Sequence, residues 1–233
     1  NGAGKSTLAL HFLGILKPTK GKVVVDGIDT REASVAELAK KVGFLFQNPD
    51  HQLVTDTVYD EIAFGPRNFG IDEKQTEAIV KRMINLAMLE GYEKNEPESL
   101  SMGQRLRLAC VSTLAMDPKI LVLDEPTVGQ DPGHLFPFMD LIARLNEGGT
   151  TVVMITHDMD LVLRYANRVV LLDGGAVRAD GIPEEVFTRS LLKSHPGIKL
   201  PGVIEFFSQV SGEDVQSLRM RSVADAVDVL KFS

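Results

Sequence analysis

The chain has 233 residues, of which 44% are hydrophobic and 24% charged, a composition typical of folded globular proteins that excludes a disordered linker. Its formal net charge of −7 gives no basic field that would favour a nucleic-acid backbone or an anionic bilayer, so a protein or small-molecule partner is expected. The longest apolar runs, "ILVL" and "TVVMI", have the length of buried strands, and no membrane-spanning helix is predicted.

The first half of the chain mixes short apolar runs with stretches of helical spacing. This pattern predicts helices over 8–16 and 34–41, a short strand and turn over 22–27, and a strand over 42–46. Gln47 follows the second strand directly. From Thr57 to about Leu89 the pattern is helical, with Gly70 as a break and Asp72 as the cap of the next helix. The single cysteine, Cys110, lies in a further apolar-periodic stretch, so it is expected to be a buried hydrophobic residue, and the absence of cysteine pairs fits a reducing cytoplasm.

The second half alternates short β-branched runs with helical stretches. The runs are "ILVLDE", "TTVVMITH" and "RVVLLDGG", separated by predicted helices within 132–149 and 158–167. Apolar strands that alternate with helices indicate a parallel sheet covered on both faces. Since proline is tolerated in the first turn of a helix, the helix that contains Pro137 is expected to begin near Phe136. The mostly helical segment from about 57 to 114 is predicted to be a lobe inserted into this α/β lobe.

The opening stretch "NGAGKST" matches most of the phosphate-binding pattern GxxxxGKS/T. In such a loop the backbone N–H groups of Gly2 to Ser6 point at phosphate oxygens, assisted by the partial positive charge at the start of the following helix. Lys5 would neutralise the β and γ phosphates, and the Ser6 hydroxyl would ligate Mg²⁺. The alternative interpretation of this stretch alone is a glycine turn that caps a helix.

Two further strand ends carry polar side chains. "ILVLDEP" places Asp124 and Glu125 at the carboxyl edge of a parallel sheet, where ligands bind in open α/β folds. Asp124 is suited to hold Mg²⁺, and Glu125 to act on a water molecule that attacks the γ-phosphate. The alternative is an exposed acidic strand end, which the preceding apolar run disfavours. His157 ends the next strand, where a neutral imidazole would hydrogen-bond a γ-phosphate oxygen.

The stretch "LSMGQRLRLA" predicts a second helix start that faces an anion. Ser101 is expected to cap the helix, and Gly103 allows the backbone to approach a ligand closely. A single chain that binds one nucleotide does not need two phosphate-binding helix starts. Two chains arranged head to tail would use both, because each would offer its Ser101 loop to the ATP that the other chain holds at Lys5.

These motifs, in this order, resemble the ATP-binding cassette (ABC) ATPases. "NGAGKST" resembles Walker A, Gln47 the Q-loop, "LSMGQ" the signature, "ILVLDE" Walker B, Asp131 the D-loop and His157 the switch histidine. The resemblance implies ATP and Mg²⁺ as ligands. It implies nucleotide contacts from Asn1, Gly2, Ala3, Gly4, Lys5, Ser6, Thr7, Ser101, Gly103, Gln104 and Asp131, catalytic roles for Gln47, Glu125 and His157, and Mg²⁺ ligands at Ser6, Gln47 and Asp124.

The resemblance also implies the fold. It predicts an α/β P-loop NTPase domain of ABC type over 1–188, with a RecA-like parallel-sheet lobe and the inserted helical lobe at about 57–114. A helical extension is expected over 189–233, where "GVIEFFSQV" and "SVADAVDVLKF" each place apolar residues on one helical face. The extension either folds onto its own domain or forms an extra contact between two ATPases.

The Q-loop region "FLFQNPDHQLVTDTVYDEIAFGPRNFG" is similar to that of cobalt/nickel and energy-coupling-factor importer ATPases. By this resemblance the chain is a peripheral subunit at the cytoplasmic face of the membrane. It would drive the import of a transition-metal ion or a vitamin. Its partners would be a second ABC ATPase, identical or different, a transmembrane coupling subunit and a substrate-binding membrane subunit, with no nucleic acid. An ATPase of another ABC transporter, including an exporter, or a soluble non-transport ABC protein is the alternative.

The chain departs from the family pattern at several positions. Met102 stands where many signatures have glycine, and Gln130 stands where the D-loop usually has leucine. The family's first Walker glycine, the strand before it and an adenine-stacking aromatic residue are absent from this sequence. We therefore expect the intact protein to begin some tens of residues earlier, and residues 1 to 233 alone to bind ATP weakly or not at all.

Overall fold

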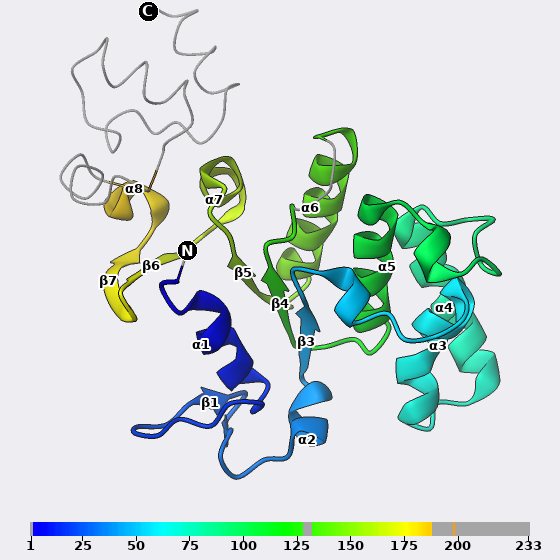
Figure 1. Ribbon diagram of the computed structural model, residues 1–233, viewed down its shortest axis with the longest axis horizontal. Helices are drawn as coiled ribbons and strands as arrows, with labels where there is room; N and C mark the ends of the chain where they lie inside the picture. The colour runs from blue at the N-terminus through cyan, green and yellow to red at the C-terminus, as the bar shows by residue number, and fades with distance from the viewer. Residues whose placement is uncertain (1, 128–131, 188–197, 199–233) are drawn as a thin grey trace, which may run out of the picture. The chain divides into compact units, whose positions relative to one another are not determined.

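The computed structural model describes residues 2–127, 132–187 and 198, which are drawn in colour in Figure 1. They belong to two compact units. The larger unit is Ser6–Ile155, and the smaller one combines Asn1–Lys5 with Thr156–Ser233. Each unit is described by itself below.

A parallel three-stranded sheet forms the centre of the larger unit. Its strands are β3 (Val42–Leu45), β4 (Ile120–Asp124) and β5 (Thr151–Ile155), in the order β3-β4-β5. Every residue of β3 is buried, and Leu121 and Leu123 of β4 have no exposed surface. Strands buried on both faces carry the near-continuous apolar runs from which the parallel sheet was predicted.

Helices cover both faces of this sheet, as Figure 1 shows. On one face, α1 (Lys5–Phe12) and α2 (Val35–Ala39) contribute Ala9 and Leu38 to a buried cluster with Val42 and Val122. On the other face α5 (Met102–Leu114) lies so close that a Cβ atom on Gly43 would come within 2.4 Å of the Thr113 Cγ2 atom. The predicted covering of both faces is therefore confirmed.

Local signals set the short elements of the first fifty residues. The predicted short strand is β1 (Val24–Val25), and the predicted turn lies at Asp26 and Gly27, after which β2 (Ile28–Asp29), a strand that was not predicted, pairs antiparallel with β1. α2 begins at a capping box formed by Ser34 and Glu37. α1 ends at Phe12 instead of residue 16, and Gly14 follows with a φ of +65° and donates its N–H to the His11 carbonyl.

The predicted helical segment consists of three helices. They are α3 (Val58–Asn68), α4 (Glu73–Ala87) and α5, preceded by the short 3₁₀ turns η1 (Pro49–His51) and η2 (Pro97–Ser99). Asp72 caps α4 by accepting the Gln75 N–H at 3.1 Å, as predicted. The left-handed conformation of Met88, with a φ of +53°, ends α4.

α6 (Pro132–Glu147) corrects one prediction. The predicted helix start near Phe136 is wrong, because Pro137 lies inside the helix. Proline is best tolerated at the first helical position, where no N–H is needed, and Pro132 already occupies that position. Pro137 therefore removes one interior hydrogen bond from α6.

The smaller unit contains α7 (Met159–Tyr165), β6 (Val169–Asp173), β7 (Ala176–Gly181) and α8 (Pro183–Val186). β6 and β7 form an antiparallel hairpin, so the expectation that the run 168–175 continues the parallel sheet is wrong among the described residues. The reason is the turn: Gly174 and Gly175 have φ values of +56° and +77°, as a two-residue hairpin loop requires. Val162, Leu163, Val186 and Phe187 form the core beneath it.

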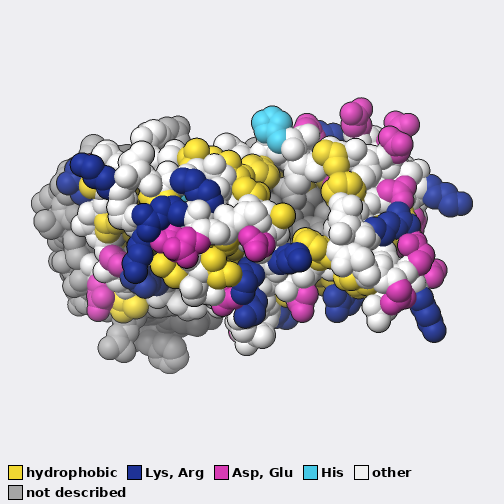
Figure 2. Space-filling model, turned by 90° about the horizontal axis from the view of Figure 1, so that it is seen from below, with side chains coloured by type: hydrophobic (Ala, Val, Ile, Leu, Met, Phe, Trp, Pro, Cys, Tyr) yellow, Lys and Arg dark blue, Asp and Glu magenta, His cyan; other side chains and the backbone are white. Residues whose placement is uncertain are grey.

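Among the described residues, none of the helices combines the length and the apolar character that crossing a bilayer requires. On the face shown in Figure 2, lysine and arginine side chains are interspersed with aspartate and glutamate side chains. Cys110 is fully buried in α5, as predicted, and burial raises the pKa of its thiol to about 12. The predicted boundary at 188/189 and the helices expected beyond it lie outside the described residues.

Candidate active site

The phosphate-loop stretch leads directly into α1. Gly2 and Gly4 have φ values of +78° and +91°, a conformation that glycine adopts at no steric cost. A Cβ atom at either position would meet nothing within 4 Å, so backbone conformation rather than crowding requires glycine here. Lys5 is the first residue of α1, and Ser6 and Thr7 are exposed in its first turn. This geometry presents a helix N-terminus with unbonded N–H groups, which favours a phosphate.

The carboxyl ends of the parallel strands bring three predicted residues to one sheet edge. Leu45 of β3 is paired with Leu123 of β4, so Gln47 leaves β3 at the edge where Asp124 ends β4 and Glu125 follows. Asp124 and Glu125 are only 7% and 8% exposed. Burial of two adjacent carboxyl groups is costly unless other groups or cations compensate their charge.

The oxygen donors of the predicted magnesium ligands fit Mg²⁺. At the sheet edge Asp124 offers a carboxylate and Gln47 an amide oxygen, and in the first turn of α1 Ser6 offers a hydroxyl. All are hard oxygen ligands of the kind that Mg²⁺ prefers. Mg²⁺ on a nucleotide is usually held through one or two carboxylates, with phosphates and water completing the shell. Within the part of the chain that the structure describes, no group of three or more histidine, cysteine, aspartate or glutamate side chains forms a metal cage.

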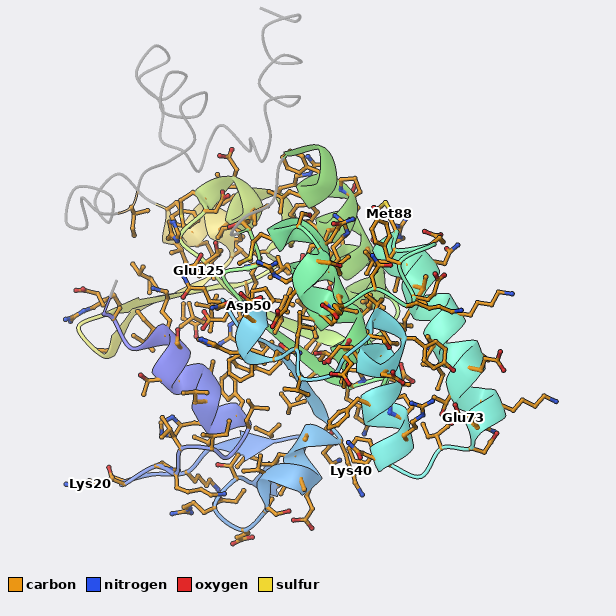
Figure 3. The ribbon with its side chains drawn as sticks, turned by 45° about the vertical axis from the view of Figure 1, so that its right-hand side comes forward. Lys20, Lys40, Asp50, Glu73, Met88 and Glu125 are labelled. Atoms are coloured by element: carbon orange, nitrogen blue, oxygen red, sulfur yellow. The ribbon has the colours of Figure 1, made fainter. Side chains whose placement is uncertain are left out.

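Glu125 has an unusual backbone, and Figure 3 labels it at the end of β4. Its φ of +52° lies in the left-handed region, which few residues other than glycine adopt. The Glu125 N–H donates to the Ile155 carbonyl at 2.8 Å, so the end of β5 holds this conformation. Backbone strain of about 1–3 kcal/mol at a single residue is typical of functional sites.

Ser101 caps α5, as predicted. Its Oγ accepts the Gln104 N–H at 3.3 Å, while the Ser101 N–H donates to the Gln104 Oε1 atom at 2.9 Å. This capping box fixes Met102 and Gly103 in the first turn of α5. The exposed Ser101 thus lies at a second ordered helix N-terminus, the arrangement that the head-to-tail hypothesis requires.

His157 lies two residues after the end of β5 and is exposed. Asp158 caps α7 by accepting the N–H groups of Asp160 and Leu161, so His157 lies immediately before a capped helix. Burial, followed by the nearby Asp158 carboxylate, raises the pKa of Asp160.

The structure thus brings Gln47, Asp124 and Glu125 together at the sheet edge of the larger unit, which also contains Ser6 and Ser101. Lys5 and His157 belong to the smaller unit. Asn1 and Asp131 lie outside the described residues.

One set of contacts at this site was not predicted. Asp50 and Gln52, in the segment after Gln47, bind Arg105 and Thr113 of α5. The only sequence signal is one opposite-charge pair 55 positions apart, too weak to recognise without the fold.

The fold and these helix starts define an α/β nucleotide-binding protein of the P-loop class. Residues 1–128 match the family described as ABC transporter. The energy-coupling factor transporter ATP-binding protein EcfA of Methanococcus maripaludis is 43% identical over 222 residues, which are 94% of this chain and 80% of that protein. The chain therefore belongs to the ABC transporter family, among its ATP-binding proteins, as the sequence predicted.

Solved structures agree with this assignment. The structure of cbiO1 from Clostridium perfringens, described as part of the ABC transporter complex cbiONQ, matches with a TM-score of 0.74 and 34% identity, covering 89% of this chain and 84% of that one. A dimeric ATP-binding cassette, MJ0796, bound to ADP and Pi matches with a TM-score of 0.70 and 31% identity over 78% of this chain and 81% of that one. Other relatives are much longer: the chain spans 38% and 37% of the length of two putative ABC transporter ATP-binding proteins.

Proposed function

We propose that the protein is the ATP-binding and ATP-hydrolysing subunit of an energy-coupling-factor type importer. The observation that carries this proposal is the 43% identity to an EcfA protein over 80% of that protein's length. The site supports it, because the buried Asp124 ends a central strand and the buried Glu125 follows it, at the edge where nucleotides bind in α/β folds.

Each predicted residue has a role in the proposed reaction. Lys5 and the N–H groups of the loop before it bind the β and γ phosphates, and Ser6, Gln47 and Asp124 would hold Mg²⁺. When bound, Mg²⁺ supplies charge that stabilises the phosphate oxygens during hydrolysis. Glu125 accepts a proton from the attacking water at its carboxylate, which is typically worth about 10²–10⁴ in rate.

Two chains complete each proposed site. Ser101 and Gly103, at the start of α5, bind the γ-phosphate of the ATP held by the partner chain, while Asp131 lies across the seam. His157, as a neutral imidazole, hydrogen-bonds a γ-phosphate oxygen. The ordered capping box at Ser101 supports this arrangement, since it places a second helix N-terminus on the surface of the same chain. The dimeric state of the MJ0796 cassette supports it by analogy.

The proposed partners follow from the similarity to EcfA and cbiO1. We infer a second ABC ATPase, a transmembrane coupling subunit and a substrate-binding membrane subunit, with this chain bound peripherally at the cytoplasmic face. The resemblance of the Q-loop region to cobalt/nickel importer ATPases supports a transition-metal ion as the cargo, and a vitamin is the second candidate. Co-purification of the full-length protein with such membrane subunits tests this assignment. Stable association with ribosomes, or with an exporter's membrane domain, would contradict it.

The catalytic proposal is tested with Glu125→Gln in the full-length protein. This variant is expected to bind Mg-ATP, to lose turnover and to accumulate as a closed dimer in size-exclusion chromatography. Glu73→Gln, at an exposed glutamate of α4, is the matched control and should hydrolyse ATP normally. Phosphate release at the wild-type rate from the Glu125 variant would remove this residue from its role.

The dimer proposal is tested with Ser101→Arg. A bulky cation at the start of α5 should block closure of the dimer, while ATP still binds to the single chain. Normal ATP hydrolysis by this variant would contradict the head-to-tail site.

A further inference from the structure

One face of α5 contacts the segment that follows Gln47. Arg105, Ala109 and Thr113 are spaced by four residues, so they form a single stripe along the helix. Each of the three contacts the segment from residue 50 to 52 through an ion pair or a hydrogen bond. α5 begins directly after the signature serine, which caps it, and the segment from residue 50 to 52 begins three residues after Gln47.

Arg105 makes the contact nearest to Ser101. Its Nε atom lies 2.8 Å from the Asp50 Oδ1 atom, and Figure 3 labels Asp50 on η1 beside α5. Its Nη1 atom donates to the Leu100 carbonyl at 2.8 Å and to the Glu98 carbonyl at 3.4 Å, and its Nη2 atom lies 3.8 Å from the Met102 Sδ atom. One guanidinium therefore binds the acidic residue after the Q-loop and two backbone carbonyls just before the signature serine, and it contacts the Met102 side chain just after it.

Gln52 makes the second contact, about one and two helical turns further along α5. Its Nε2 atom donates to the Ala109 carbonyl at 3.1 Å and to the Thr113 Oγ1 atom at 2.7 Å, and its Oε1 atom accepts the Phe46 N–H at 3.4 Å. The same side chain thus ties α5 to the residue directly before Gln47. The two contacts fix both the position and the rotation of α5 relative to the Q-loop segment.

We propose that Arg105 is a positioning residue that holds the loop of Ser101 in register with the Gln47 segment, through its simultaneous contacts with Asp50 and the Leu100 carbonyl. This proposal rests on the proposed function, since it assigns Ser101 to the partner chain's ATP. Displacement of the Q-loop segment by a nucleotide or a membrane subunit then moves the signature loop with it.

The geometry favours positioning over stabilisation. The Asp50 side chain is 53% exposed and that of Arg105 21% exposed, and ion pairs with such exposure contribute little to folding. The contact with the Leu100 carbonyl uses a planar group whose donors have fixed directions, which lysine does not have. A charged hydrogen bond of this kind changes an equilibrium constant by about ten- to hundredfold.

The test uses the full-length protein with Arg105→Gln and Arg105→Lys, each also combined with Glu125→Gln for dimerisation assays. Arg105→Gln should lower kcat for ATP by about tenfold or more and weaken ATP-driven dimer formation by a similar factor. The Kd of ATP for the single chain and the Tm should change no more than in the control. Arg105→Lys should recover less than half of the lost kcat on a logarithmic scale, because lysine restores the charge but not the planar guanidinium with its fixed donor directions.

Arg67→Gln is the matched control. Arg67 also lies in the helical segment and pairs with two carboxylates, Asp60 at 2.9 Å and Glu73 at 2.7 Å, but it contacts no residue of the signature stretch in any described interaction. Its substitution should leave kcat and dimer formation unchanged. Equal losses in the Arg67 and Arg105 variants would overturn the proposal, since any arginine of this lobe would then be equivalent.

A charge swap separates the ion pair from the backbone contacts. Asp50→Arg with Arg105→Asp restores opposite charges, but an aspartate at 105 has no donor for the Leu100 carbonyl. Dimer formation should therefore stay defective. Full recovery in the swap, or wild-type kcat in Arg105→Gln, would overturn the positioning role. Normal hydrolysis by Ser101→Arg would instead overturn the proposed function, so the two failures are distinguishable.

Discussion

Glu61 allows a quantitative test of how the chain between the Q-loop and α3 is held. Its side chain lies in the first turn of α3 and the residue is 4% exposed. Its Oε2 atom accepts three hydrogen bonds: from the Val54 N–H at 2.9 Å, the Thr55 N–H at 3.0 Å and the Thr55 Oγ1 hydroxyl at 2.9 Å. One buried carboxylate thus fixes the segment that leads from the Gln47 region into α3.

The magnitude follows from these three contacts. Hydrogen bonds to a charged group contribute about 1.5–3 kcal/mol each, and because one oxygen accepts all three we take the lower end, about 4 kcal/mol for Glu61→Ala. Glu61→Gln keeps a neutral acceptor of the same shape and should cost about half, or about 2 kcal/mol. In a domain of this size about 1 kcal/mol lowers Tm by about 2–4 °C, so the expected losses are about 8–16 °C and about 4–8 °C.

The assay is thermal unfolding of the full-length protein, followed by circular dichroism. Glu73→Ala is the matched control, because Glu73 also lies in the first turn of a helix but its side chain is 64% exposed. Its substitution should lower Tm much less. Equal shifts for Glu61→Ala and Glu73→Ala, or a larger loss for Glu61→Gln than for Glu61→Ala, would refute the reasoning from burial and shared hydrogen bonds.

Three further predictions concern the core. Leu123→Ala, at a fully buried position of β4, should lower the free energy of unfolding in urea by about 3 kcal/mol. Val170→Ala, at a residue that is 48% exposed, should lower it by less than about 1 kcal/mol, and equal losses would contradict the assigned core. Gly43→Ala should cost about 2 kcal/mol through the clash with Thr113, and adding Thr113→Ser, which removes the clashing methyl, should recover part of it; no recovery would contradict the close packing. Since burial raises the pKa of the Cys110 thiol to about 12, this thiol should resist alkylation at pH 8 until the protein unfolds, and rapid alkylation of the folded chain would contradict this. As pH rises from 9 to 12, the wild type should lose more stability than Cys110→Ala, because in this range the thiol ionises only in the unfolded state.

Features encoded within a few residues were predictable from the sequence. Ser101 and Asp72 cap their helices as expected, because an N-cap depends on one side chain and the backbone three residues ahead. Asp124 ends a buried strand as expected, because an apolar run followed by carboxyl groups marks the end of a parallel strand. These local rules were sufficient to predict the sheet edge and its donors.

Two kinds of feature were not predicted: those where local signals compete, and contacts between residues far apart in the sequence. Residues 169–172 are as apolar as those of β4, yet Gly174 and Gly175 turn β6 back on β7. The helix start at Pro132 competes with Pro137, and the sequence alone gave no reason to place the second proline inside the helix. The pair of Asp50 and Arg105 forms only once the helical lobe is folded, because 55 positions separate the two residues.

At Glu125 the left-handed backbone conformation favours glycine for stability, whereas the proposed hydrolysis of ATP requires a carboxylate. Glycine would adopt the φ of +52° without strain but has no carboxylate, while valine, isoleucine and threonine are disfavoured by their branched Cβ. Under selection for stability alone, Glu125→Gly is therefore the expected replacement, and under selection for hydrolysis glutamate remains despite its strain. The spectrum of residues that survive here in a library would tell which of the two selections dominates.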